Sequence, residues 1–210
     1  MKKMDIDRIK LMGHRAFVGG DGDYWDKIGL LQLNFLKSEG LKKNDTLIDI
    51  ACGSLRAGRL FIDYLNEGKY LGLEKEISLL LYGVSEELGI DKYRDKKPEF
   101  VVSGDFEFNK FHGQPNYAIA QSLFTHLTDV DISRCLKLFR KFIKNDVNFY
   151  VTFFEVSMPT KNQSYSDSLD SFFYTKKQMQ ELANDAGWKM HYIGDWGHPR
   201  DQKIIKLLRH

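Results

Sequence analysis

Two acidic residues and one glycine in the first half of the chain have the types and spacing that fit a nucleoside. The run TLIDIACGSLRAG at 46–58 places Asp49 in a short apolar segment and Gly53 in the loop that follows. A turn that binds pyrophosphate is expected to read G-x-G-x-x-G, so that bare backbone approaches the phosphates. Here the run is Ala51-Cys52-Gly53-Ser54-Leu55-Arg56, with only the central glycine in place. The pattern argues against a dinucleotide, whereas a nucleoside without phosphates tolerates Ala51.

The second acidic residue lies where a bound ribose would need it. Ribose hydroxyls pair with an acidic side chain at the end of the next strand, about 20 residues after the glycine. Glu74 follows Gly53 by 21 residues and ends the strand-like run KYLGLE. The alternative interpretations are structural: Asp49 caps the following turn, and Glu74 is a solvated charge beside Lys75 and Glu76.

Composition predicts an ordinary globular domain. The chain has 210 residues, of which 42% are hydrophobic and 29% charged, and a net charge of +2. A chain of this length and hydrophobic content can form one sizeable core. The small net charge argues against nucleic acid as a partner. No apolar run approaches the roughly 20 residues that span a bilayer, so we expect no membrane partner. Cys52 and Cys135 form no CxxC or Cys/His cluster, so we expect a reducing, cytoplasmic location and no metal site.

Strand-like and helix-like segments alternate from residue 46 onward, which predicts parallel neighbours joined by crossover helices. The expected strands are 46–50, 69–74, 99–104, 116–122, 147–156, 188–194 and 204–208, and the expected helices are 56–65, 76–89, 129–144 and 175–186. We predict an α/β fold, a three-layer αβα sandwich with a mostly parallel seven-stranded sheet and an antiparallel C-terminal strand. The last two strands are expected to be antiparallel because the link between them is short.

We predict a single domain, residues 1–210, with a core at 44–210. Residues 13–23 are rich in glycine and are expected to form a loop, after which Asp23 caps a helix of about four turns. We expect residues 1–40 to cover the active-site edge of the core.

Four motifs in order resemble the class I S-adenosylmethionine-dependent methyltransferases. They are IDIACGSLRAGRLFIDYL with KYLGLE, then VVSGDFEF, NYAIAQSLFTHL and a closing AGWKMHYIGDW with IIKLL. The resemblance runs from about residue 25 to the end of the chain and implies S-adenosyl-L-methionine as the cofactor.

The resemblance implies roles for particular residues. Asp49 and Gly53 would line the methionine part of the cofactor, and Glu74 would pair with the ribose hydroxyls. Asp105 would accept a hydrogen bond from the adenine amino group, with Phe106 beside the ring.

Further cofactor contacts follow from the same resemblance. Gln121 would lie near the sulfonium, and Arg56 would meet the cofactor carboxylate at a helix N-terminus. Ala51 belongs to the same set as part of the turn. Ala51 and Leu55 replace glycines that are common in the family, and Leu55 adds bulk beside the loop.

Three residues near the expected carboxyl ends of strands are candidates for proton transfer. Histidine is the commonest base near neutral pH, so His126 is the first candidate and His198 the second. Glu155 is an alternative base or an orienting partner. The structural alternatives are a packing or capping role for His126 and an exposed turn for His198. His14 and Arg15 of the N-terminal loop would add a lid to the edge where these candidates lie.

These features predict a methyltransferase that acts on a hydroxyl or amine of a small-molecule or sugar-like acceptor by in-line displacement. Residues 157–173 form an insertion whose Tyr165, Phe172 and Phe173 would enclose the acceptor or pack into the core. The alternatives are a cofactor-binding module without catalysis and a nucleic-acid methyltransferase, which the net charge and the lack of an Asn-Pro-Pro-Tyr run oppose. A homodimer is one possible oligomeric state, which the sequence does not decide.

Overall fold

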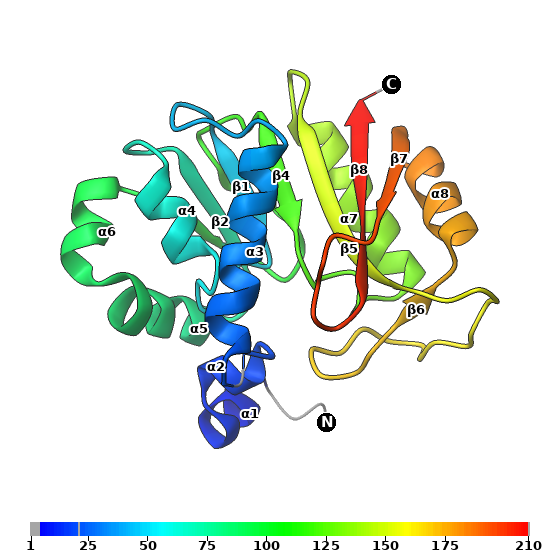
Figure 1. The fold of residues 1–210 in the computed structure, drawn as a ribbon, viewed down its shortest axis with the longest axis horizontal. Helices are drawn as coiled ribbons and strands as arrows, with labels where there is room; N and C mark the ends of the chain where they lie inside the picture. The colour runs from blue at the N-terminus through cyan, green and yellow to red at the C-terminus, as the bar shows by residue number, and fades with distance from the viewer. Residues whose placement is uncertain (1–4, 21, 210) are drawn as a thin grey trace. The chain divides into compact units, whose positions relative to one another are not determined.

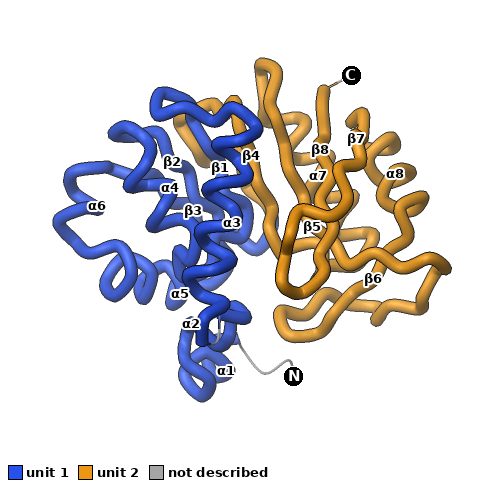
Figure 2. The backbone as a smooth tube through the Cα atoms, viewed as in Figure 1, with its two compact units in different colours: residues 1–105 blue, residues 106–210 orange. Residues whose placement is uncertain are grey.

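A computed structural model of the chain describes residues 5–20 and 22–209, in two units that divide after Asp105 (Figure 2). Unit 1 contains three parallel strands in the order β3-β2-β1, with Leu47 paired to Tyr70 and Glu74 to Val102. Every residue of β1 and β2 is buried. The elements of unit 1 are α1 (Asp5–Met12), α2 (His14–Phe17), α3 (Tyr24–Ser38), β1 (Leu47–Ile50), α4 (Gly58–Tyr64), β2 (Tyr70–Glu74), α5 (Ile77–Tyr82), η1 (Gly83–Leu88), α6 (Ile90–Lys96) and β3 (Glu99–Val102) (Figure 1).

Two local predictions for unit 1 need correction, and a third gains a detail. The glycine-rich segment 13–23 was expected to be a loop, but its first part forms the short helix α2, and Asp21 lies outside the described residues. Asp23 does not cap α3 with its side chain, because its backbone is already helical (φ −66°, ψ −14°), whereas a capping residue is extended. The helix expected at 76–89 is confirmed, and it changes at Gly83 from α5 to the π-helix η1.

Unit 2 contains the strands β4-β5-β8-β7 in that order, with the short β6 also paired to β5. The β4–β5 pair is parallel, whereas β8 runs antiparallel to both β5 and β7. The predicted antiparallel end is therefore confirmed, with β8 inserted between its two neighbours. The elements of unit 2 are η2 (Phe108–Lys110), β4 (Tyr117–Ala120), α7 (Asp129–Phe142), β5 (Asn148–Glu155), β6 (Phe173–Tyr174), α8 (Lys176–Asp185), β7 (Trp188–Gly194) and β8 (Gln202–Arg209).

Aromatic packing and helix caps stabilise unit 2. Phe139 of α7 lies 4.8 Å from the Phe149 ring and 5.9 Å from the Trp188 ring, between centroids. Thr175 caps α8 by accepting a hydrogen bond from the Gln178 backbone N–H, and the Gln178 side chain accepts from the Thr175 N–H in return.

The architecture confirms the predicted fold class: α/β, mostly parallel, with an antiparallel C-terminal strand. The described residues contain eight strands and not the predicted seven, because the two-residue β6 adds one. Among these residues, the helices are all too short or too polar to cross a bilayer.

Candidate active site

The turn after β1 adopts the backbone of a glycine-rich loop although it contains one glycine. Ala51 (φ 64°), Gly53 (φ 56°) and Leu55 (φ 64°) all have left-handed backbones. This conformation costs a non-glycine residue about 1–2 kcal/mol. The amides of Ala51 and Cys52 both donate to the carbonyl of Leu73 on β2, which fixes the start of the turn.

The Leu55 side chain points into the core of unit 1. It is fully buried, and its Cγ lies 2.7 Å from the position that a Cβ on Gly83 would occupy. Its Cδ2 makes a similar approach to Gly58, at 2.8 Å. The bulk that the sequence placed beside the loop is therefore accommodated by two glycines, one on α4 and one at the start of η1.

Glu74 lies at the turn, as the sequence predicted from its spacing. Its Oε2 accepts a hydrogen bond from the Gly53 amide at 2.9 Å. Its Oε1 accepts from the amides of Lys75 and Glu76 at 2.8 and 3.0 Å. Burial raises the pKa of Glu74, and these three donors offset part of that effect because they favour the ionised form. Its role toward a ribose stays a prediction.

Asp49 is buried with a partner that the sequence analysis missed. The Tyr70 hydroxyl donates to Asp49 Oδ2 at 2.9 Å. Leu47 is the register partner of Tyr70, and Asp49 lies two residues on, so both side chains occupy the same face. Burial raises the pKa of Asp49 to about 7, and the hydrogen bond from Tyr70 opposes that rise.

Arg56 contacts the N-terminal segment. Its Nη1 donates to the carbonyl oxygens of Val18 and Gly19 at 3.1 and 3.3 Å. Val18 Cγ1 lies 3.1 Å from the position of a Cβ on Gly53. The predicted contact of Arg56 with a cofactor carboxylate stays a prediction.

Asp105 and Phe106 lie at the division between the units. The Asp105 amide donates to the Ser103 hydroxyl at 3.1 Å in unit 1. Phe106 begins unit 2 with a left-handed backbone (φ 56°), and its ring stacks on Phe108 at 6.2 Å between centroids.

In unit 2 the loop between β7 and β8 meets the end of β4. His198 Nε2 lies 3.2 Å from Gln121 Nε2, and both side chains are buried. The Arg200 amide donates to His198 Nδ1 at 3.2 Å. The backbone N–H and the amide NH2 both donate, and a neutral imidazole accepts at only one of its two ring nitrogens.

Gln121 belongs to a polar network that the sequence analysis also missed. Gln202 Oε1 accepts from Gln121 Nε2 at 3.1 Å and from the Thr152 hydroxyl at 2.8 Å. Gln202 Nε2 donates in turn to the Ser122 hydroxyl at 2.9 Å. The sequence carried a partial signal, because Thr152 is a short polar side chain among the aromatic and aliphatic residues of β5.

The tautomer of the His126 ring is set by a backbone carbonyl. Its Nδ1 lies 2.8 Å from the Asp170 carbonyl oxygen, which only accepts, so Nδ1 carries the proton and Nε2 the lone pair. The insertion after β5 also packs on this segment, because the Phe172 amide donates to the Thr125 carbonyl at 2.8 Å. Phe172 is fully buried and Tyr165 is half exposed.

Glu155 pairs with β7. It accepts a hydrogen bond from the Tyr192 hydroxyl, and Lys176 Nζ lies 4.0 Å from the centre of the Tyr192 ring. Burial and the Glu155 carboxylate raise the pKa of Tyr192 to about 12. The structure therefore brings Gln121 and His198 together, and gives His126 and Glu155 partners of their own.

The geometry can be compared with known proteins. Neither family models nor curated protein sequences match this chain. Solved structures do match it. Magnesium protoporphyrin IX methyltransferase from Synechocystis PCC 6803 with bound SAM superposes with a TM-score of 0.67 at 13% identity, covering 99% of this chain and 92% of that one.

Two other solved structures agree with this match. A SAM-dependent methyltransferase from Aquifex aeolicus gives a TM-score of 0.65 at 15% identity, over 99% of this chain and 100% of that one. The chain has the fold of S-adenosylmethionine-dependent methyltransferases. The glycopeptide N-methyltransferase MtfA has the same methyltransferase fold, with a TM-score of 0.64 at 12% identity over 87% of this chain and 90% of that one.

Proposed function

We propose that the protein is a methyltransferase that uses S-adenosyl-L-methionine and transfers a methyl group to a hydroxyl or amine of a small-molecule or sugar-like acceptor. One observation carries the proposal: Glu74 Oε2 lies 2.9 Å from the Gly53 amide, at the turn after β1 of a methyltransferase fold. An acidic side chain at this place suits the two hydroxyls of an unphosphorylated ribose.

The polar groups of the turn fit such a cofactor. A carboxylate offers about four lone-pair sites, and Glu74 uses three of them on backbone amides. Ser54 Oγ is fully buried, and no hydrogen-bond partner for it is found among the described residues. A buried hydroxyl normally has a partner, so a ligand or a water molecule is expected there. We assign Glu74 to the ribose, Asp49, Ala51, Gly53 and Arg56 to the amino-acid part, Asp105 and Phe106 to the adenine, and Gln121 to the sulfonium.

The two histidines receive different roles from their contacts. When bound, the cofactor supplies an electrophilic methyl group, and the protein orients the acceptor and excludes water. His126 Nε2 has the lone pair that takes the acceptor's proton, and the Asp170 carbonyl holds the ring in that tautomer. His198 Nε2 instead lies against the Gln121 amide, and we assign His198 the role of positioning that side chain. Glu155 is kept as an orienting partner through Tyr192.

The proposed acceptor class is argued from residues of this chain and not from the compared enzymes. The compared enzymes are named for a magnesium porphyrin and for a glycopeptide, so the shared fold leaves the acceptor open. Tyr165, half exposed on the insertion that packs against the His126 segment, supports an acceptor of modest size. The two buried, unpaired thiols Cys52 and Cys135 support a cytoplasmic location.

A second candidate is a cofactor-binding module without catalysis. It is favoured by the left-handed backbones of Ala51 and Leu55 and by the contact of Val18 with the turn. Turnover of any acceptor by the purified protein would exclude it.

Calorimetry with S-adenosylmethionine and its demethylated product, S-adenosylhomocysteine, tests the leading proposal. Glu74→Gln keeps the side-chain shape but removes the charge, and is expected to weaken binding by about tenfold. Glu76→Gln is the matched control, because its backbone amide, which contacts Glu74, is unchanged. No binding of either compound at millimolar concentration would refute the proposal.

A further inference from the structure

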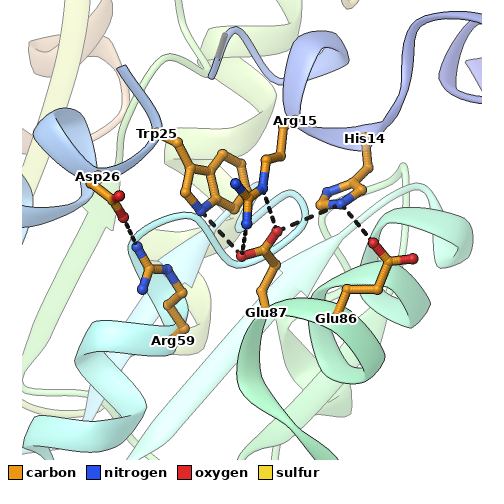
Figure 3. A network of polar contacts seen from close by, with 7 residues as sticks. All are labelled: His14, Arg15, Trp25, Asp26, Arg59, Glu86 and Glu87. Carbon is orange, nitrogen blue, oxygen red and sulfur yellow. Dashed lines mark hydrogen bonds and ion pairs between the residues drawn. The ribbon is translucent and has the colours of Figure 1, made fainter. Parts of the chain in front are cut away.

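The Glu87 carboxylate connects the π-helix η1 to the N-terminal segment of unit 1 (Figure 3). Only 3% of its side chain is exposed. Arg15 donates to it twice, from Nε to Oε1 at 2.6 Å and from Nη2 to Oε2 at 3.0 Å. Trp25 Nε1 donates to Oε2 at 3.1 Å. A two-point arginine contact to a buried carboxylate is strong and sensitive to geometry.

His14 adds a second contact from the same segment. Its Nε2 lies 3.3 Å from Glu86 Oε2 and 3.6 Å from Glu87 Oε1. Its ring stacks on Tyr82 of α5 at 5.1 Å between centroids. The sequence predicted that His14 and Arg15 add a lid, and both side chains point toward the acidic pair on η1 (Figure 3).

The segment held in this way lies on the turn after β1, residues 51–56, which the proposed function makes the nucleoside-binding turn. Val18 Cγ1 lies 3.1 Å from the position that a Cβ on Gly53 would occupy, and the carbonyls of Val18 and Gly19 accept from Arg56 of the same turn. The Gly53 amide is the group that binds Glu74. A ligand that binds between the turn and this segment has to move Val18 and Gly19 away from Arg56. Glu87 resists that movement because it holds Arg15 of the same segment.

We propose that residues 14–20 form a lid over the nucleoside-binding turn, and that Glu87 is a positioning residue that latches this lid and sets the rate of cofactor exchange. This inference rests on the proposed function. It assigns to Glu87, which is remote in sequence from the motifs of the turn, control over how fast the ligand enters and leaves.

Stopped-flow binding of S-adenosylhomocysteine, followed by tryptophan fluorescence, tests the latch. Glu87→Gln and Arg15→Ala are each expected to raise the association and dissociation rate constants by about tenfold. Arg15 is half exposed, so its variant is expected to fold even if the buried Glu87 does not tolerate change. Asp26→Asn is the matched control, since Asp26 is exposed and pairs with Arg59 beside the network without touching Glu87.

Hydrogen exchange without ligand gives an independent measurement. The amides of Val18 and Gly20, which donate to carbonyls within the lid, are expected to exchange faster in Glu87→Gln than in the control. Unchanged rate constants and unchanged exchange in both latch variants would overturn the lid while leaving the methyltransferase proposal intact. Absence of ligand binding by the wild-type protein would instead overturn the proposed function.

Discussion

Replacement of Asp49 by asparagine is expected to remove a large part of the pH dependence of stability. Asp49 is buried and accepts a hydrogen bond from Tyr70. Burial raises its pKa from 3.8 to about 7. In the unfolded chain the group ionises near its ordinary value, so between these two values the folded state binds the extra proton. Stability therefore falls as pH rises through this window.

The size of the effect follows from the same two values. The full rise in pKa corresponds to about 4 kcal/mol of unfolding free energy, most of it lost by pH 7. About 2.5 kcal/mol of this loss falls between about pH 5 and pH 8. The asparagine side chain would keep an acceptor for the Tyr70 hydroxyl, so Asp49→Asn is expected to flatten the profile by that amount without opening a cavity.

Urea unfolding at a series of pH values, followed by tryptophan fluorescence and circular dichroism, measures this difference. Asp91→Asn is the control, because Asp91 is almost fully exposed and no change in slope is expected. Equal pH profiles for the wild type and Asp49→Asn would refute the reasoning, since Asp49 would then be ionised in the folded protein at pH 5.

Two further predictions concern the turn and the candidate base. Ala51→Gly is expected to raise the unfolding free energy by roughly 0.5–1 kcal/mol, because it relieves a left-handed alanine, whereas Leu55→Gly, at the same φ, is expected to lower it by about 2–5 kcal/mol through lost packing. Denaturant unfolding compares the two. His126→Asn is expected to lower kcat by about a hundredfold with cofactor affinity unchanged, measured with an acceptor found by screening and by calorimetry.

Each of these has a contradicting result. Destabilisation by both glycine variants would mean that Ala51 makes contacts that outweigh its backbone strain. Unchanged turnover in His126→Asn would remove His126 as the base, and loss of cofactor binding in that variant would mean that its role is in binding.

The sequence determined the features that depend on local order. Alternating apolar segments predicted strands and helices close to those observed, because side-chain periodicity is set by the backbone of each element. The spacing of Gly53 and Glu74 predicted their proximity, since parallel neighbours end at the same edge. The short link before β8 predicted its antiparallel direction.

Only the tertiary structure decided where side chains meet across elements. The sequence places the bulk of Leu55 beside the turn, but the direction of this side chain depends on the space that Gly58 and Gly83 leave. The tautomer of His126 depends on a carbonyl 44 residues away, and His198 lies beside Gln121, 77 residues away. The hydrogen bonds of Glu87 with the N-terminal segment join residues separated by up to 72 positions. Such contacts depend on how helices and strands pack against one another, and no local sequence pattern specifies that packing.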